Sequence, residues 1–138
     1  ESFQPEYNLY SRDSFEGELQ QLCIRENLGV ITYFSLAAGF LTGKYRGEAD
    51  LHKSKRGHGM DKYFTPRGFR ILDALDQVAA RHSVTPATVA LAWLIAQPGV
   101  TAPISSATSL KQLNTLTEAA KLQLDKESLQ QLTDASAY

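Results

Sequence analysis

Residues 29–46, GVITYFSLAAGFLTGKYR, hold the residue types best suited to bind a phosphorylated ligand. The first part, residues 30–34, is rich in β-branched and aromatic side chains, which predicts a short buried strand. Small residues follow from Ser35 to Gly39, and small residues let a backbone approach a ligand closely. Lys44 comes soon after and could neutralise a phosphate. The alternative is an ordinary strand-to-helix turn followed by a solvated lysine.

A second stretch repeats this arrangement near the C-terminus. Residues 100–105 predict another strand, and small residues follow it directly. Ser109 and Gln112 have the spacing of a capping box, so a helix should begin there. The free N–H groups of that helix, with the hydroxyls of Ser106 and Thr108, could hold a phosphate.

The sequence predicts no metal site and no reactive thiol. His52 and His58 lack Cys or carboxylate partners at metal-binding spacing. Cys23 lies on the apolar face of a predicted helix, which is typical of a core cysteine. His82 is expected near a helix C-terminus, where an imidazole interacts favourably with the helix dipole.

The composition is that of one globular domain at most, with 138 residues and a formal net charge of −1. This charge favours neither nucleic acid nor an anionic membrane as a partner. No apolar run reaches the roughly 18 residues that a membrane helix needs, and no signal peptide is visible. A single cysteine fits a reducing compartment, so we expect a cytoplasmic protein.

The N-terminal part predicts a strand, a helix and a second strand. Residues 2–10 should be extended, although Pro5 argues against a strand bonded on both sides. Asp13 and Glu16 have the spacing of a capping box, and Gly29 should end the helix that they open. The apolar face of this helix consists of Leu19, Leu22 and Cys23.

Residues 47–65 form a polar stretch without a secondary-structure period. Such a long loop is either solvated and flexible or a lid that grips an anion. Its basic and histidine side chains are His52, Lys53, Lys55, Arg56, His58 and Lys62.

Four helices and one strand should make up the rest of the chain. Pro66 opens a helix whose apolar stripe consists of Ile71, Leu72, Leu75, Val78, Ala79 and His82. Thr85 and Pro86 open the next helix, residues 87–97, which is apolar on nearly all sides and should be buried. After the strand at 100–105 come a helix with a face of Leu110, Leu113 and Leu116, and a last helix capped by Asp125.

Strands separated by helices imply a parallel sheet with right-handed crossovers. Three such strands cannot close a barrel, so the sheet should have two open edges. The chain also begins at Glu1 with strand-like sequence, and we expect it to be a part of a longer protein.

Four motifs, in this order, resemble the C-terminal half of an aldo-keto reductase. They are QPEYNLY, GVITYFSLAAGFLTGKYR, TPATVALAWLIAQPGV and TAPISSATSLKQL. The resemblance covers nearly the whole chain and implies an α/β fold, namely part of a TIM (β/α)8 barrel. Residues 1–138 would be the C-terminal portion of that single domain: roughly strands six to eight, their helices and the C-terminal helix.

The resemblance implies the cofactor-binding half of an NADP(H)-dependent oxidoreductase that reduces aldehydes and ketones to alcohols. NADPH is the expected cofactor, with NADH as the alternative, and the substrate would be a small carbonyl compound. The catalytic Tyr, Lys, Asp and His of the family lie on the N-terminal half. No residue here matches them, so the parent protein would be the enzyme and this chain alone would be inactive.

The family pattern also assigns cofactor contacts. Gln4 would hydrogen-bond the nicotinamide carboxamide, and Tyr33 would stack on the nicotinamide ring. The pyrophosphate would run along Phe34, Ser35, Leu36, Ala37 and Lys44, beneath the loop at 47–65. The adenosine 2′-phosphate and adenine would be surrounded by Ser106, Thr108 and Gln112. Arg67 is a further candidate for a phosphate contact.

Two positions depart from the family. Lys111 is the only basic residue in 106–112, where the family often grips the 2′-phosphate with Arg or Lys. The pair Thr115-Leu116 stands where the family commonly has Glu-Asn facing the adenine.

Two other functions fit the same sequence. One is a non-catalytic nicotinamide-binding regulatory subunit that resembles potassium-channel β subunits. The other is a half-barrel that pairs with a second copy of itself. The expected partner is therefore either the missing N-terminal half or a second copy, because each would cover the open sheet edges.

Overall fold

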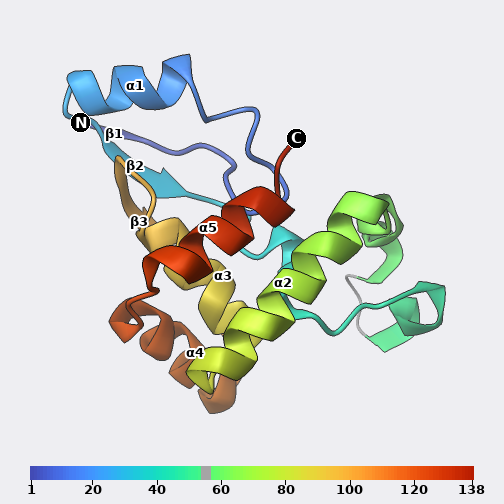
Figure 1. Cartoon of the computed structure of the whole chain (residues 1–138). Coiled ribbons are helices and arrows are strands. Elements are labelled where there is room, and N and C mark those ends of the chain that lie inside the picture. The colour runs from blue at the N-terminus through green and yellow to red at the C-terminus, as the bar shows by residue number, and fades with distance from the viewer. Residues whose placement is uncertain (54–56) are drawn as a thin grey trace.

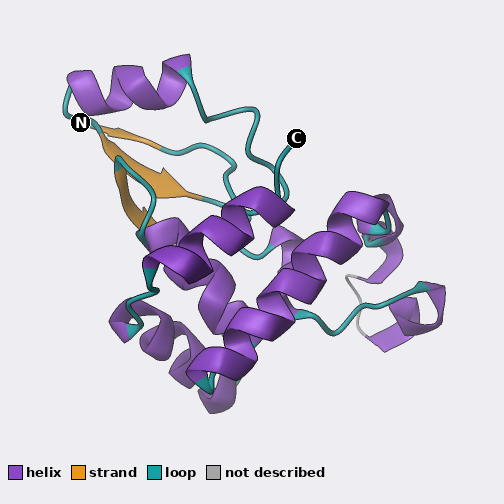
Figure 2. Ribbon diagram, in the orientation of Figure 1, coloured by secondary structure: helices purple, strands orange, loops and turns teal. Residues whose placement is uncertain are grey.

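The computed structural model describes residues 1–53 and 57–138. Its strands form a parallel sheet in the order β1-β2-β3, as Figure 2 shows. They are β1 (Ser2–Phe3), β2 (Gly29–Thr32) and β3 (Val100–Pro103). The α/β class and the parallel arrangement are thus confirmed. The strands are shorter than expected. After β1 and β2 end, the segments that follow them pair through an isolated bridge between Glu6 and Tyr33.

Helices alternate with the strands as the sequence predicts. They are α1 (Glu18–Arg25), α2 (Pro66–His82), α3 (Pro86–Ile95), α4 (Leu110–Lys121) and α5 (Lys126–Ala135). Figure 1 shows α1 beside β1, with the other four helices gathered on the far side of the sheet. Among these, α3 packs against α2, α4 and β3. None of the helices in the described part of the chain is long and apolar enough to cross a bilayer.

The helix α3 forms the centre of the core because it is apolar on nearly all sides. Residues 87–94 are all buried, as expected. Thr85 caps the helix by accepting a hydrogen bond from the Thr88 amide at 3.2 Å. The buried indole of Trp93 donates to the Thr133 hydroxyl on α5 at 3.2 Å, which ties the two helices together.

The predicted start and end of α1 are wrong. The helix begins at Glu18, after Gly17, and no side chain caps it. Glu16 instead forms a two-pronged ion pair with Arg12, at 2.7 and 2.8 Å, and an ion pair of that geometry outweighs a cap. The helix ends at Arg25, and Asn27, rather than Gly29, adopts the left-handed backbone, with φ 50°.

The long loop contains short 3-10 helices, which corrects the expectation of no secondary structure. They are η2 (Glu48–Lys53), η3 (Gly57–Gly59) and η4 (Asp61–Tyr63). Tyr63 is buried, and its ring stacks on Phe40 with centroids 4.9 Å apart. Short turns of this kind need only local i→i+3 bonds, so no hydrophobic period announces them. The predicted anion-gripping residues Lys55 and Arg56 lie outside the described residues.

The helix α4 is capped as predicted, because the Ser109 hydroxyl accepts from the Gln112 amide at 3.2 Å. Its leucine face, however, is largely uncovered: Leu110 is 80% and Leu113 51% exposed.

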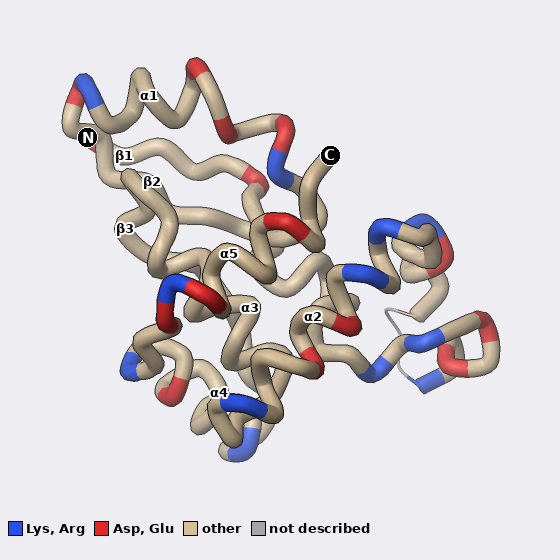
Figure 3. Tube along the Cα trace, in the orientation of Figure 1, with Lys and Arg blue, Asp and Glu red and all other residues tan. Residues whose placement is uncertain are grey.

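Among the described residues, Arg12 is the one charged residue classed as buried, and the others lie nearer the surface. Figure 3 shows acidic and basic residues interspersed along the outer helices and the long loop. The strands and α3 carry no charged residue. Local electrostatics is therefore set by individual pairs rather than by a large field of one sign.

Candidate functional site

The carboxyl ends of the strands meet at one edge of the sheet. The Tyr33 amide donates to the Pro5 carbonyl at 3.0 Å, and the Ile104 amide donates to the Thr32 carbonyl at 2.7 Å. The segments that follow β1, β2 and β3 therefore lie side by side. In α/β proteins, ligands bind at the carboxyl ends of parallel strands. Gln4, exposed, lies in the first of these segments.

An aromatic pair is exposed at the end of β2. Tyr33 is 39% and Phe34 54% exposed, and their ring centroids lie 5.3 Å apart. Large apolar rings exposed at a strand end offer a flat surface for a ring of a ligand. Tyr33 therefore presents an exposed ring just after β2, and its stacking role stays a prediction.

The turn after β2 has a strained backbone. Phe34, Ala37 and Ala38 all have left-handed backbones, with φ of 51°, 48° and 55°. Each such residue costs about 1–3 kcal/mol, and such strain is concentrated at ligand sites. The turn leads into η1 (Ala37–Thr42).

The side chains that follow Phe34 in this turn are buried or half-buried. Ser35 is buried, and its hydroxyl donates to the Thr32 carbonyl at 3.2 Å. Ala37 is buried, and Leu36 is half-buried against the core. A ligand could therefore touch Ser35 and Ala37 only through their backbone, whereas part of the Leu36 side chain is accessible.

Lys44 lies just past η1, alongside this turn. Its ammonium is 5.0 Å from the centroid of the Tyr45 ring, and its Cε lies near Gly39. The Lys44 carbonyl accepts from the Lys53 ammonium at 3.2 Å, and Lys53 also pairs with Asp50 at 2.7 Å. The charge of Lys53 is thus balanced, whereas that of Lys44 faces an aromatic ring.

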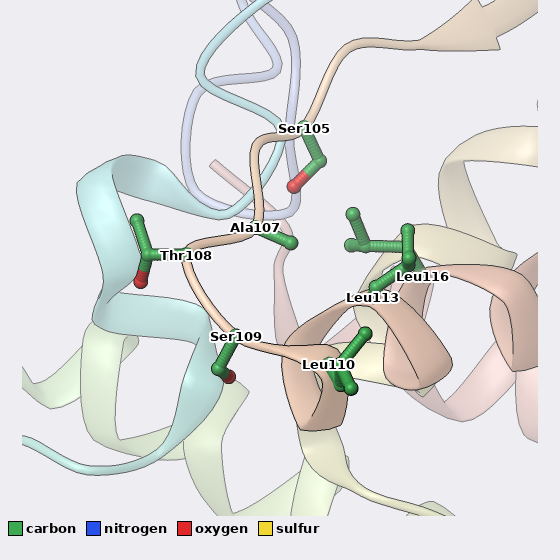
Figure 4. A pocket seen from close by; sticks show the side chains of 7 residues that line it. All are labelled: Ser105, Ala107, Thr108, Ser109, Leu110, Leu113 and Leu116. Carbon is green, nitrogen blue, oxygen red and sulfur yellow. The ribbon is translucent and has the colours of Figure 1, made fainter.

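The connection from β3 to α4 borders an open hollow, drawn in Figure 4. The residues that line it are Ser105, Ala107, Thr108, Ser109, Leu110, Leu113 and Leu116. In that view, Ser105 and Ala107 point toward the leucines, whereas Thr108 points away from them. Ser106 is exposed but does not line the hollow.

Thr108 and Gln112 bind each other. The Gln112 side-chain oxygen accepts from the Thr108 amide at 2.7 Å and from the Thr108 hydroxyl at 3.1 Å. The Thr108 proton is thus already used, and Gln112 has its amide N–H group left to offer. The Ser106 hydroxyl has no partner within residues 1–53 and 57–138. An anion at this end of α4 would meet Ser106, Gln112 and the first-turn amides.

Arg67 binds the C-terminal segment in this structure, and its phosphate contact stays a prediction. Its guanidinium donates to the carbonyls of Tyr10 and Ser136, both at 2.8 Å, and to that of Ala137 at 3.1 Å. These bonds from Nε and Nη2 tie the segment after β1 to the C-terminus. The described residues also contain no group of three or more His, Cys, Asp or Glu side chains that could hold a metal ion.

The sequence reasoning missed Asn8, whose buried side chain donates to the Phe34 carbonyl at 2.9 Å. The same side chain accepts from the amides of Tyr10 and Ser11, which is an Asx turn. The segment Asn-Leu-Tyr-Ser could have suggested that turn. The contact with Phe34, 26 residues away, leaves no signal in a single sequence.

A buried cluster beside Asn8 was also missed. The Tyr7 hydroxyl donates to Glu16 at 2.7 Å, next to the Arg12 pair. Burial raises the pKa of Tyr7, so the phenol keeps its proton and remains a donor. Burial alone would also raise the pKa of Glu16, but hydrogen bonds from Arg12 and Tyr7 hold that pKa below its ordinary value.

Comparison with known proteins identifies relatives of this chain. "Probable aldo-keto reductase 1" of Glycine max is 28% identical over 139 residues, covering 96% of this chain and 38% of the relative. The NADP(+) aldo-keto reductase yakc of Schizosaccharomyces pombe is 24% identical, with 96% and 40% covered. "Probable voltage-gated potassium channel subunit beta" of Arabidopsis thaliana is 33% identical, with 80% and 35% covered. The chain thus spans about two fifths of the length of these relatives.

A solved structure supports the fold. The crystal structure of a thermostable aldo-keto reductase with the inhibitor epalrestat superposes with a TM-score of 0.67 at 21% identity. The match covers 96% of this chain and 38% of that one, in agreement with part of a TIM barrel. A family model described as "Aldo/keto reductase family" matches residues 1–137. Because that match extends over nearly all of the sequence, this chain belongs to the aldo/keto reductase family.

Proposed function

We propose that this chain is the cofactor-binding, C-terminal part of an NADP(H)-dependent aldo-keto reductase barrel. It would supply roughly strands six to eight, their helices and the C-terminal helix of an enzyme that reduces small aldehydes and ketones. One observation carries the proposal: the ends of all three strands lie at one edge, and Tyr33, the strained turn and the start of α4 follow them. A reducing cytoplasm suits the buried free thiol of Cys23.

The residues at this edge fit a nicotinamide dinucleotide. Tyr33 offers an exposed aromatic face, and the exposed Gln4 amide could hydrogen-bond a carboxamide. Backbone groups of residues 34–37 and the Lys44 ammonium suit a pyrophosphate. Ser106 and the amides that open α4 suit a terminal phosphate. When bound, the cofactor supplies the hydride, while these residues bind and orient it.

NADPH is the preferred cofactor in this proposal. The fission-yeast relative is named an NADP(+) enzyme. Lys111, exposed at the start of α4, is the cation closest in sequence to Ser106 and Thr108. Because a single exposed lysine contributes little, we expect only a modest preference for NADPH over NADH.

The first test is a calorimetric titration of the chain with NADP+. Tyr33→Ala should weaken binding about tenfold because it removes the stacking face. Tyr33→Phe, which keeps the ring, should bind within about twofold of the unsubstituted chain. An unsubstituted chain that binds no NADP+, or a Tyr33→Ala variant that binds equally well, contradicts the proposal.

The second test is turnover. The parent protein should consume NADPH with an aromatic aldehyde, and this chain alone should not, because it lacks residues that match the catalytic Tyr, Lys, Asp and His of the family. A parent that oxidises NADPH with no carbonyl compound would contradict the enzyme proposal.

A regulatory role is the second candidate, favoured by the relatives named as potassium-channel β subunits, at 33% and 32% identity. In that case the parent would bind NADP+ and retain a potassium channel in a pull-down but would turn over no aldehyde. Turnover without channel binding favours the reductase instead.

A further inference from the structure

Asn8 joins two turns at the candidate site. Its side chain is fully buried, and all of its hydrogen-bonding groups have partners. The amide nitrogen donates to the Phe34 carbonyl at 2.9 Å. The amide oxygen accepts from the backbone N–H groups of Tyr10 and Ser11, both at 2.8 Å. This one side chain therefore links the segment after β1 to the strained turn after β2.

Phe34 is the residue that needs such a link. A left-handed backbone, with φ 51°, is unfavourable for a bulky aromatic residue and persists only where its surroundings hold it. The Phe34 carbonyl accepts both the Asn8 amide and the Ala37 amide, the latter at 2.7 Å. On the other side, the Tyr33 carbonyl accepts from the Tyr7 amide at 3.4 Å. The two peptide groups that flank the Phe34 Cα are thus held by hydrogen bonds.

The direction of this turn decides where the aromatic pair lies. Tyr33 is the last residue to pair with the segment after β1, and Phe34 turns the chain away from the sheet. The two rings are then exposed beside each other at the edge. If Phe34 returned to an extended backbone, the chain would continue along the sheet and this presentation of the rings would change.

We propose that Asn8 is a positioning residue for the site: its amide N–H holds Phe34 left-handed and so places the Tyr33 ring for the ligand. The identity of that ligand rests on the proposed function, but the effect of Asn8 on the turn does not. Asparagine suits this role because it donates and accepts at once. The substitution Asn8→Asp would keep both acceptor bonds, lose the donor and set a carboxylate against the Phe34 carbonyl.

The test without ligand uses NMR spectra of the full chain. A strong NOE between the amide proton and Hα of the same residue reports a positive φ, and Phe34 should show it. Asn8→Asp should lose this NOE. Ser11→Ala is the matched control in the same turn, because it removes only the hydroxyl bond to Glu6 at 3.0 Å, and it should keep the NOE.

The test with ligand uses a double-mutant cycle and NADP+ titration. Asn8→Asp should weaken NADP+ binding about fivefold or more, the effect of one lost hydrogen bond with an unpaired group left behind. In a Phe34→Gly background the same change should alter binding by less than about twofold, because glycine adopts a positive φ unaided. If Asn8→Asp alone does not fold, the double variant should fold for the same reason.

Each outcome is decisive. The positioning role is overturned if Asn8→Asp keeps the Phe34 NOE, if the NOE is lost while NADP+ affinity is unchanged, or if the Phe34→Gly background gives no rescue. An unsubstituted chain that binds no NADP+ overturns the proposed function instead. In that case the NOE comparison alone tests whether Asn8 keeps the backbone of Phe34 left-handed.

Discussion

Arg12 connects the segment after β1 with the last turns of α5. Its guanidinium binds both carboxylate oxygens of Glu16 and also donates to the Thr133 carbonyl and the Ser136 hydroxyl, both at 2.9 Å. These two partners, on α5 and at its C-cap, lie 121 and 124 positions along the chain from Arg12. A guanidinium this deeply buried is tolerated only when charge and hydrogen bonds are satisfied together, so loss of one partner should be strongly destabilising.

Glu16 makes the stability of the fold dependent on pH. Burial alone would raise the pKa of Glu16, but the hydrogen bonds from Arg12 and Tyr7 leave it below the ordinary value. As pH falls, the unfolded chain therefore takes up this proton first, and stability is lost. The contribution of Glu16 is complete near neutral pH and declines below about pH 5, continuing through the folded-state pKa.

We predict that Glu16→Gln lowers the free energy of unfolding by about 2–4 kcal/mol near neutral pH, since it leaves Arg12 without its counter-charge. The difference between the variant and the unsubstituted chain should shrink on acidification, as measured by urea denaturation across that range. Glu18→Gln, on the exposed first turn of α1, is the control and should change little. Equal losses in the two variants would refute the assignment.

Helix ends show which parts of the fold a sequence can predict. Thr85, Ser109 and Asp125 cap their helices as predicted, because a cap depends on a few consecutive residues. Asp13 and Glu16 have the same spacing but form no cap, because Arg12 and Tyr7 bind Glu16 in the folded chain. Prediction failed where side chains outside the cap motif bound the residue that would have completed the cap.

The start of α2 depends on a close approach to η4. A Cβ at Gly68 would overlap the Tyr63 carbonyl oxygen. Gly68→Ala should therefore push η4 away and lower the free energy of unfolding by about 1–3 kcal/mol, even though alanine favours helix. Thermal unfolding measures this as a lower Tm.

Gly59→Ala is the matched control for that substitution, because no atom lies within 4 Å of the added Cβ. Its stability should stay within about 0.5 kcal/mol of the unsubstituted chain. A Gly68→Ala variant as stable as this control would show that η4 does not need the close approach.

At the scale of the whole molecule, the parallel arrangement of the strands was predictable and the side-chain arrangement of the site was not. Alternating strands and helices imply a parallel sheet, and a parallel sheet brings its strand ends together. The family resemblance, rather than that reasoning, assigned Tyr33 and Ser106 to one cofactor. The inward turn of Ser35 and the bond between Thr108 and Gln112 depend on side-chain geometry that no spacing encodes.

The same sheet also leaves strand edges open. In the described chain β1 and β3 each pair only with β2, and unpaired N–H and C=O groups at an edge can bind another strand. We therefore expect the purified chain to self-associate through β3, where Ala102 is exposed. Light scattering after size-exclusion chromatography should give a mass above that of one chain, rising with concentration.

Ala102→Lys should shift this equilibrium toward the monomer, because a charged lysine on an edge strand opposes edge-to-edge pairing. Ala49→Lys adds the same charge at an exposed position on η2 and should leave the association intact. A monomer at every concentration, or an equal response to both lysines, would show that the edge of β3 does not drive association. A monomer at every concentration would mean that the strand edges are protected in the isolated chain. An equal response to both lysines would mean that net charge, rather than strand pairing, controls association.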